Sequence, residues 1–162
     1  MTGPAIPEWL PPLIEMSPWN ERVLAELYAI FRLDFIENPP RYQGSVVWFF
    51  PERDQDKERI FWHLTEREDP PGSGNRLPDF RRCERFRWAR ALFDHCDDPQ
   101  VKSWDYEEGA GDIRTYIWLE DLDYVVVMKR YPGGRRRLIT AHFIDYESKR
   151  RSLRRKFSNR LV

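Results

Sequence analysis

The chain of 162 residues is 41% hydrophobic and 15% aromatic, which is enough apolar material for a folded interior and excludes a disordered chain. Lysines plus arginines and acidic residues number 27 each, so the formal net charge is zero. No apolar run approaches the roughly 18 to 20 residues that span a bilayer, and the N-terminus lacks a basic segment followed by an apolar core. We therefore expect a cytoplasmic protein without membrane contacts.

The neutral total hides a strong charge asymmetry. Residues 129–162 contain 12 Lys or Arg against only Asp145 and Glu147, a net charge of +10, so the preceding 128 residues carry −10. A basic segment of this kind attracts phosphate through Coulomb forces and counterion release. The alternative is a solvated helix face, or a segment that pairs with the acidic half of its own chain.

The first part of the chain reads as an arm followed by a helix, over residues 1–41. Five prolines within residues 1–18 prevent a regular helix, so we predict an extended arm that packs on the body or on a partner. The helix is expected to use Ser17 as its N-cap, with Pro18 in the first helical position. It should end before Asn38, which precedes two prolines.

Residues 42–162 are expected to form one α+β domain, and it begins with a hairpin. The segment GSVVWFF at residues 44–50 is β-branched and aromatic, and IFWHL at residues 60–64 follows a polar stretch. This pattern predicts two strands joined by a long loop. His63 would then lie in the second strand, facing the opposite way from Trp62.

A helix is predicted over residues 78–96, where five arginines alternate with apolar residues. Apolar side chains cover most of its circumference, so at least one arginine should point inward, and Arg82 and Arg85 should share a face. A buried arginine needs an anionic partner. The candidates for that partner are Glu84, Asp79 and a substrate phosphate.

Cys83 and Cys96 both fall on this predicted helix. At a rise of about 1.5 Å per residue they would lie roughly 20 Å apart. A disulfide requires Cα atoms within about 7 Å of each other. Both cysteines should therefore be free thiols, as in a reducing compartment.

The last third of the chain predicts strands at residues 101–106, 113–119, 124–129 and 136–143, with a turn at residues 131–134. A basic C-terminal helix follows, anchored by Leu153 and Phe157, which are spaced by one helical turn. The expected fold class is α+β. Helices pack on an antiparallel sheet of about four strands, with an extra N-terminal helix and hairpin.

Motifs for metal or nucleotide chemistry are missing from the sequence. There is no CxxC, no HxxxH, no DxD cluster on a plausible loop, and no phosphate-binding glycine loop, so we expect neither a metal nor a cofactor. The remaining His, Arg, Lys, Tyr and Thr residues suit metal-independent RNA cleavage. In that reaction a base removes the ribose 2′-proton, an acid protonates the leaving oxygen, and cations stabilise the phosphorus-centred charge.

Three residues are the first candidates for this chemistry. Thr140 and His142 alternate onto one face of their predicted strand together with Leu138, so a hydroxyl donor and a proton carrier would lie side by side. The alternative is that both are half-buried strand residues. His63 is flanked by apolar residues, and the alternative for it is a structural histidine held by hydrogen bonds.

The segments FWHLTER, RLPDFRRCERFRW, TYIWLEDLDYVVVMKR and RRLITAHFID, in this order, resemble the phage- and toxin-associated nucleases of the barnase, EndoU, colicin and RelE-like group. The resemblance covers roughly residues 42–157. It implies a helix packed on a four-stranded antiparallel sheet and metal-independent RNA cleavage. Its matching positions here are His63, Arg82, Arg85 and Thr140. Where such proteins often have an aromatic after the Thr-Ala pair, this chain has His142.

The leading hypothesis is thus a metal-independent endoribonuclease. It includes the role of a toxin that is held in check by an antitoxin or immunity protein. Its substrate would be RNA, such as a tRNA or an mRNA. His63 or His142 would transfer protons, and Arg82, Arg85 and Thr140 would hold phosphate. The residues expected to bind nucleic acid are Tyr146, Lys149, Arg150 and Arg154.

Two alternatives come from other functional classes. The first is a non-catalytic module that uses the basic C-terminal helix to bind nucleic acid or an acidic protein. The second is a structural or interaction protein of a mobile element, with the acidic N-terminal half as its working surface.

Overall fold

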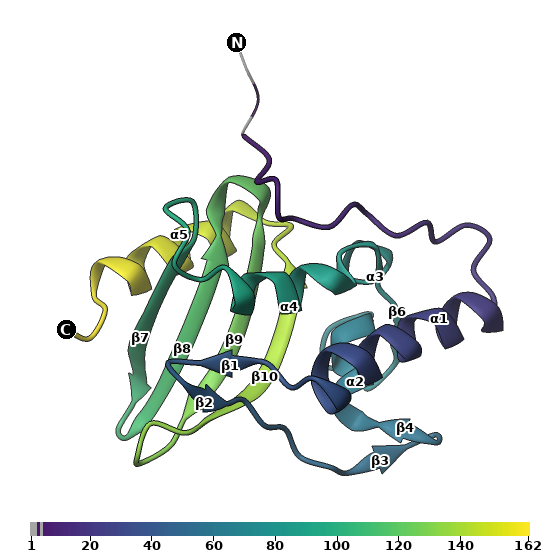
Figure 1. Ribbon diagram of the computed structural model, residues 1–162, viewed down its shortest axis with the longest axis horizontal. Coiled ribbons are helices and arrows are strands. Elements are labelled where there is room, and N and C mark those ends of the chain that lie inside the picture. Colours follow the sequence, from purple (N-terminus) through teal and green to yellow (C-terminus); the bar gives the residue numbers. More distant parts are fainter. Residues whose placement is uncertain (1–2, 4) are drawn as a thin grey trace.

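The computed structural model describes residue 3 and residues 5–162, and its centre is a four-stranded antiparallel sheet (Figure 1). The strands are β7 (Lys102–Gly109), β8 (Asp112–Leu119), β9 (Tyr124–Arg130) and β10 (Arg136–Phe143). Their order is β10-β9-β8-β7, so each strand pairs with its neighbour in the chain. The four predicted strands, the turn at residues 131–134 and the α+β class are confirmed.

The connections of the sheet are tight. Gly111 adopts a positive φ of 74° between β7 and β8, which explains why β7 runs past its predicted end to Gly109. Between β8 and β9 lies the short 3-10 helix η2 (Glu120–Leu122), followed by Asp123 in the left-handed region. Gly133 and Gly134 supply the positive φ angles of the turn before β10.

Two layers of helices cover the two faces of the sheet (Figure 1). One face carries the main core, to which the arm and the helices before the sheet contribute; its fully buried side chains include Phe31, Phe61 and Leu92. The other face carries a smaller core around Trp104 and Trp118, covered by α5 (Glu147–Ser158). The predicted basic C-terminal helix is confirmed, with Leu153 buried and Phe157 packed against the same core.

The N-terminal helix α1 (Glu21–Phe31) starts later than expected. Its N-cap is Asn20, whose Oδ1 accepts a hydrogen bond from the Val23 N–H at 3.0 Å, so the prediction of Ser17 as the cap is wrong. Asn and Ser are comparable caps, and Asn20 has the side-chain geometry that reaches the first free N–H groups. The helix continues as a π-helical turn, η1 (Arg32–Glu37), and ends before Asn38 as predicted.

The predicted hairpin between residues 44–50 and 60–64 is wrong. The second segment belongs to α2 (Arg59–Thr65), a helix, so His63 lies on a helix and not on a strand. The reason is the spacing of Ile60, Phe61 and Leu64, which are all buried and mark one face of a helix. A short apolar run fits both helix and strand, and here the packing against the core selects the helix.

Three small hairpins form instead in this part of the chain. They pair β1 (Arg41–Tyr42) with β2 (Ser45–Val46), β3 (Arg53–Asp54) with β4 (Lys57–Glu58), and β5 (Glu66–Glu68) with β6 (Arg76–Pro78). The first two turn through pairs of residues with positive φ, which is the conformation that two-residue hairpin loops favour.

The predicted helix over residues 78–96 is present but broken. It divides into α3 (Phe80–Glu84) and α4 (Phe86–Asp94) at Arg85, whose φ and ψ of −102° and 17° are not helical. Cys83 is buried in α3 and Cys96 lies beyond the end of α4. Both are free thiols, as predicted, although they do not share one continuous helix.

Strand β10 contains a β-bulge. Its register against β9 shifts between Leu138 and Thr140, which leaves Ile139 as the extra residue. Leu138 belongs to the main core, whereas Thr140 and His142 line a pocket on the opposite face, so the prediction that all three share a face is wrong. One extra residue shifts the alternation by one position, and this is how a bulge re-aims side chains.

The free edge of β10 is partly covered. The Leu138 N–H donates to the Trp48 carbonyl at 2.8 Å, and the Trp48 N–H donates to the Arg136 carbonyl at 3.2 Å. Helices α2 and α3 pack beside the same strand. Side chains of both helices are thereby brought next to the half of β10 that carries Thr140.

No helix within the part of the chain that the structure describes is long and apolar enough to cross a membrane.

Candidate active site

A cleft of about 480 Å³ lies where α2, α3, β10 and the start of α5 meet. We call it the His63 cleft. His63 comes from α2, Arg82 from α3 and Thr140 from β10, while Tyr146 and Lys149 come from the start of α5. Five of the nine residues predicted from the sequence as site residues therefore line one cavity.

His63 sits in the last turn of α2, exposed at the wall of the cleft. Partial desolvation of its ring lowers its pKa, and the positive charges of Arg76, Arg82 and Arg59 lower it further. The imidazole is therefore neutral at pH 7. A neutral imidazole is the form that accepts a proton.

Arg82 is fixed in place by the residues around it. Its Nη1 donates to the carbonyls of His63 and Glu66, both at 2.8 Å, and its Nε lies 3.3 Å from a carboxylate oxygen of Asp79. Asp79 also caps α3 by accepting from two backbone N–H groups. Arg82 thus holds the C-terminal end of α2 against α3, and Asp79 is the anionic partner that the sequence left open.

Thr140 is the point at which three cavities meet. It lines the His63 cleft, a pocket between the sheet and α5, and a third pocket beside Phe50. We call these two the sheet–helix pocket and the Phe50 pocket. The bulge at Ile139 is the local cause, because it turns Thr140 away from the main core.

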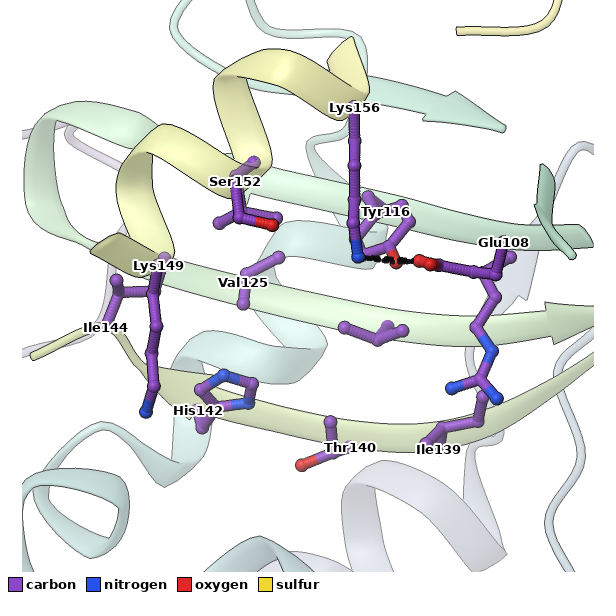
Figure 2. Close-up of a pocket in the computed structure, with 13 residues that line it drawn as sticks. Glu108, Tyr116, Val125, Ile139, Thr140, His142, Ile144, Lys149, Ser152 and Lys156 are labelled. Carbon is purple, nitrogen blue, oxygen red and sulfur yellow. Dashed lines mark hydrogen bonds and ion pairs between the residues drawn. The ribbon is translucent and has the colours of Figure 1, made fainter. Parts of the chain in front are cut away.

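The sheet–helix pocket has a volume of about 440 Å³ and contains His142 (Figure 2). Thr140 and Lys149 line both this pocket and the His63 cleft, so the two cavities adjoin. His63 and His142 line different cavities. Thr140 lines both cavities, so the two histidines lie on either side of this residue and do not belong to one site.

His142 is more deeply buried than His63. Burial lowers its pKa to about 4, and the charges of Arg82 and Lys149 act in the same direction. Its Nδ1 is buried and has no hydrogen-bond partner in the described part of the chain. At neutral pH this ring is uncharged.

Arg85 does not line any of the three cavities. Its guanidinium lies over the ring of Phe143, 4.4 Å from the centroid, and its Nη1 bonds Glu84 at 3.1 Å. Arg81 supplies a carbonyl acceptor for the same nitrogen. The break between α3 and α4 places Arg85 in this packing role, with Glu84 as its anionic partner.

Arg150 and Arg154 also lie outside the three cavities and are paired within the chain. Arg150 binds Asp123 at 2.6 Å, and Arg154 binds Glu120 at 2.9 Å. These hydrogen bonds raise the pKa of both guanidinium groups. Much of the charge of α5 therefore pairs with the acidic part of the chain, which is the alternative that the charge asymmetry left open.

Further residues of the site were not predicted from the sequence. The His63 cleft includes Arg67 and Arg76, and the Phe50 pocket includes Arg59 and Arg137. Phe50 itself is 48% exposed, and the Arg137 guanidinium lies 4.2 Å from its ring centroid. The sequence carries no signal for this arrangement, because Phe50, Arg59 and Arg137 come together only in the folded chain.

The His63 cleft is mixed in charge. Its lining has four cations, Arg67, Arg76, Arg82 and Lys149, and four carboxylates, Glu68, Asp69, Asp79 and Asp145. Each cation lies within 4.0 Å of a carboxylate. No group of three His, Cys, Asp or Glu side chains among the described residues is placed to hold a metal ion.

Comparison of the chain with protein-family models, with curated proteins and with solved structures found no match.

Proposed function

We propose that this protein is a metal-independent endoribonuclease that cleaves RNA through attack of a ribose 2′-hydroxyl on the adjacent phosphate. The observation that carries the proposal is the convergence of His63, Arg82 and Thr140 on one cleft. These residues are distant in sequence, and all three are matching positions of the resemblance to toxin-associated nucleases. A neutral histidine, a fixed cation and a hydroxyl donor are the groups that this reaction uses.

His63 acts as the general base in this proposal. It takes the proton from the 2′-hydroxyl as the 2′-oxygen forms its bond to phosphorus. The bond from phosphorus to the 5′-oxygen then breaks, and that oxygen receives a proton from Tyr146 or Lys149, the two donors on the other wall of the cleft. The products are a 2′,3′-cyclic phosphate and a 5′-hydroxyl.

Thr140 and the cations stabilise the charge that develops on phosphorus. Thr140 can donate its hydroxyl to a phosphate oxygen, and Lys149, with a side chain 50% exposed, is the most accessible cation of the cleft. Arg82 acts partly through position, since its bond to the His63 carbonyl holds the catalytic histidine in place. Such fixed donors contribute because they need no reorganisation during the reaction.

The alternative of a non-catalytic module that binds through α5 has weaker support. Arg150, Arg154 and Lys156 each pair with a carboxylate of the same chain, so binding an external anion would require these pairs to break. The cations of the His63 cleft are paired as well, but there His63 and Thr140 lie in the same cavity. A toxin role, with an antitoxin or immunity protein as partner and a tRNA or an mRNA as target, is part of our proposal. Its support is the resemblance of the sequence segments to toxin-associated nucleases.

The test is incubation of labelled RNA with the wild type and with His63→Ala in EDTA. We expect cleavage by the wild type and a loss of about 100-fold or more in the variant. His95→Ala is the matched control, because His95 stacks on Trp9 away from all three cavities and should keep full activity. Intact RNA with every target class, or equal activity of His63→Ala and wild type, would overturn the proposal.

A further inference from the structure

The sheet–helix pocket has an apolar middle and polar ends (Figure 2). Val125, Val127 and Ile139 form its floor on the sheet, and Leu153 of α5 faces them. At one end Glu108, Tyr116 and Lys156 form a hydrogen-bonded group, with Lys156 Nζ 2.7 Å from Glu108 and 3.1 Å from the Tyr116 hydroxyl. A layer between a sheet and a helix, with an apolar floor and with polar groups at its ends and on α5, suits a flat heterocycle.

The other end of the pocket holds His142, whose ring projects from β10 toward α5 in Figure 2. Its Nδ1 is buried and has no hydrogen-bond partner in the part of the chain described by the structure. Nε2 is therefore the nitrogen left to face the pocket. A ligand with a matching group can bond Nε2 in place of water.

The tautomer of His142 follows from the same burial. A buried N–H is left unpaired less often than a buried acceptor, so the proton belongs on Nε2, and Nδ1 keeps only a lone pair. His142 then presents one N–H donor to the pocket. The matching ligand group is a hydrogen-bond acceptor such as a carbonyl oxygen.

We infer that the sheet–helix pocket binds one base of the RNA strand whose phosphate occupies the His63 cleft, and that it favours a base with a carbonyl group facing His142. This inference rests on the proposed function. The pocket volume of about 440 Å³ lies within the range of roughly 300 to 1,000 Å³ that is typical of small-ligand sites.

The connection between the two cavities supports RNA as the source of the base. Thr140 and Lys149 line both, so a nucleotide can place its phosphate beside them on one side and its base on the other. Three of the pocket's charged residues, Arg114, Lys149 and Lys156, are cations, against the single carboxylate Glu108. Each of these cations also lies within 4.0 Å of a carboxylate, so a phosphate would share them with those groups.

Nucleoside 3′-monophosphates test the inference, because they carry a base and a phosphate but no bond to cleave. We expect 3′-UMP and 3′-GMP, whose bases have carbonyl oxygens where 3′-CMP and 3′-AMP have amino groups, to bind about tenfold more tightly in titration calorimetry. His142→Leu should abolish this preference. His142→Gln, whose amide N–H can replace the Nε2 donor, should retain it.

A second pair of variants tests the place of binding. Ser152→Leu puts a bulky side chain into the pocket from α5 and should weaken binding of all four nucleotides at least tenfold. Ser158→Leu is the matched control, because Ser158 is exposed on the same helix and does not line the pocket. Thermal unfolding of each variant checks that the fold is kept.

Failure of this inference can be distinguished from failure of the proposed function. RNA cleavage that is identical in wild type and Ser152→Leu, together with equal binding of all four nucleotides, would overturn the base pocket and leave the nuclease. Base-dependent nucleotide binding that Ser152→Leu removes, in a protein that cleaves no RNA, would support the pocket and overturn the nuclease.

Discussion

The two faces of the central sheet are built in different ways. The main core face buries large apolar side chains completely, with Phe31, Phe61 and Leu92 at 0% exposure. The α5 face has a smaller apolar core, and ion pairs between α5 and the acidic loops hold the helix in place. The α5 face keeps the sheet–helix pocket and His142, whose buried Nδ1 has no hydrogen-bond partner among the described residues.

This difference assigns stability mainly to the main core face and ligand binding to the α5 face. A closed apolar core stabilises in proportion to the area that it buries and leaves no room for a ligand. A helix held by charge pairs at its rim can leave space beneath it. The His63 cleft lies beside β10, where the two layers meet. Residues of α2 and α3, which pack on the main core, form part of its walls, and the sheet–helix pocket adjoins it on the α5 side.

The largest effect that should distinguish the faces is on stability. Phe31→Ala removes a fully buried ring from the main core and should lower the free energy of unfolding by about 3 to 5 kcal/mol. Leu153→Ala, in the smaller core beneath α5, should cost about 2 kcal/mol, because the adjacent pocket already leaves that site less tightly packed. Urea denaturation measures both. Equal losses would contradict the difference between the faces.

The second effect is a pH dependence of stability that arises from His142 on the α5 face. The pKa of His142 is lowered to about 4 in the folded protein, against an ordinary value of about 6.5 in the unfolded chain. Between these values the unfolded chain binds the extra proton, so stability should fall as the pH drops from 6.5 to 4, by up to about 1 kcal/mol per pH unit.

His142→Leu should flatten this slope, measured by urea denaturation at a series of pH values. His63 contributes in the same direction because its pKa is also lowered, so part of the slope should remain. An unchanged slope in His142→Leu would show that the imidazole is not held neutral by burial.

Much of the fold could be predicted from the sequence, and the failures have local causes. The strands of the sheet and α5 were predictable because alternation and turn residues agree there. The helical nature of residues 60–64 was not, because a five-residue apolar run has no unique period and the main core selects the helix. The bulge at Ile139 could not be predicted either, because one extra residue does not show in the alternation of apolar and polar residues.

The candidate site was predictable in part for the same reasons. His63, Arg82, Thr140, Tyr146 and Lys149 meet in one cleft, although the sequence placed His63 on the wrong kind of element. Arg150 and Arg154 lie elsewhere because each has an anionic partner that only the tertiary structure brings within reach, and Arg85 lies elsewhere because the break between α3 and α4 places it over Phe143. Charge in a sequence does not say which cations remain unpaired.

The smallest effect concerns the ion pairs of α5. Hydrogen bonds from Lys102 and Arg154 lower the pKa of Glu120 although burial opposes this, so Glu120 adds stability above its unfolded pKa and loses it as the pH falls through the folded value. Glu120→Gln should cost roughly 0.5 to 1 kcal/mol at low salt and less at high salt. Leu92→Ala in the main core should show no comparable salt dependence. A loss that salt does not reduce would mean that packing, not charge, holds α5.

The most direct test of the central claim is the chemistry of the RNA ends. In EDTA, we expect the wild type to produce 2′,3′-cyclic phosphate and 5′-hydroxyl ends, identified by mass spectrometry, and to leave intact a substrate with 2′-deoxyribose at the cleavage site. Both results require that the 2′-hydroxyl is the nucleophile. Cleavage of the deoxy substrate, or 5′-phosphate ends, would contradict the account.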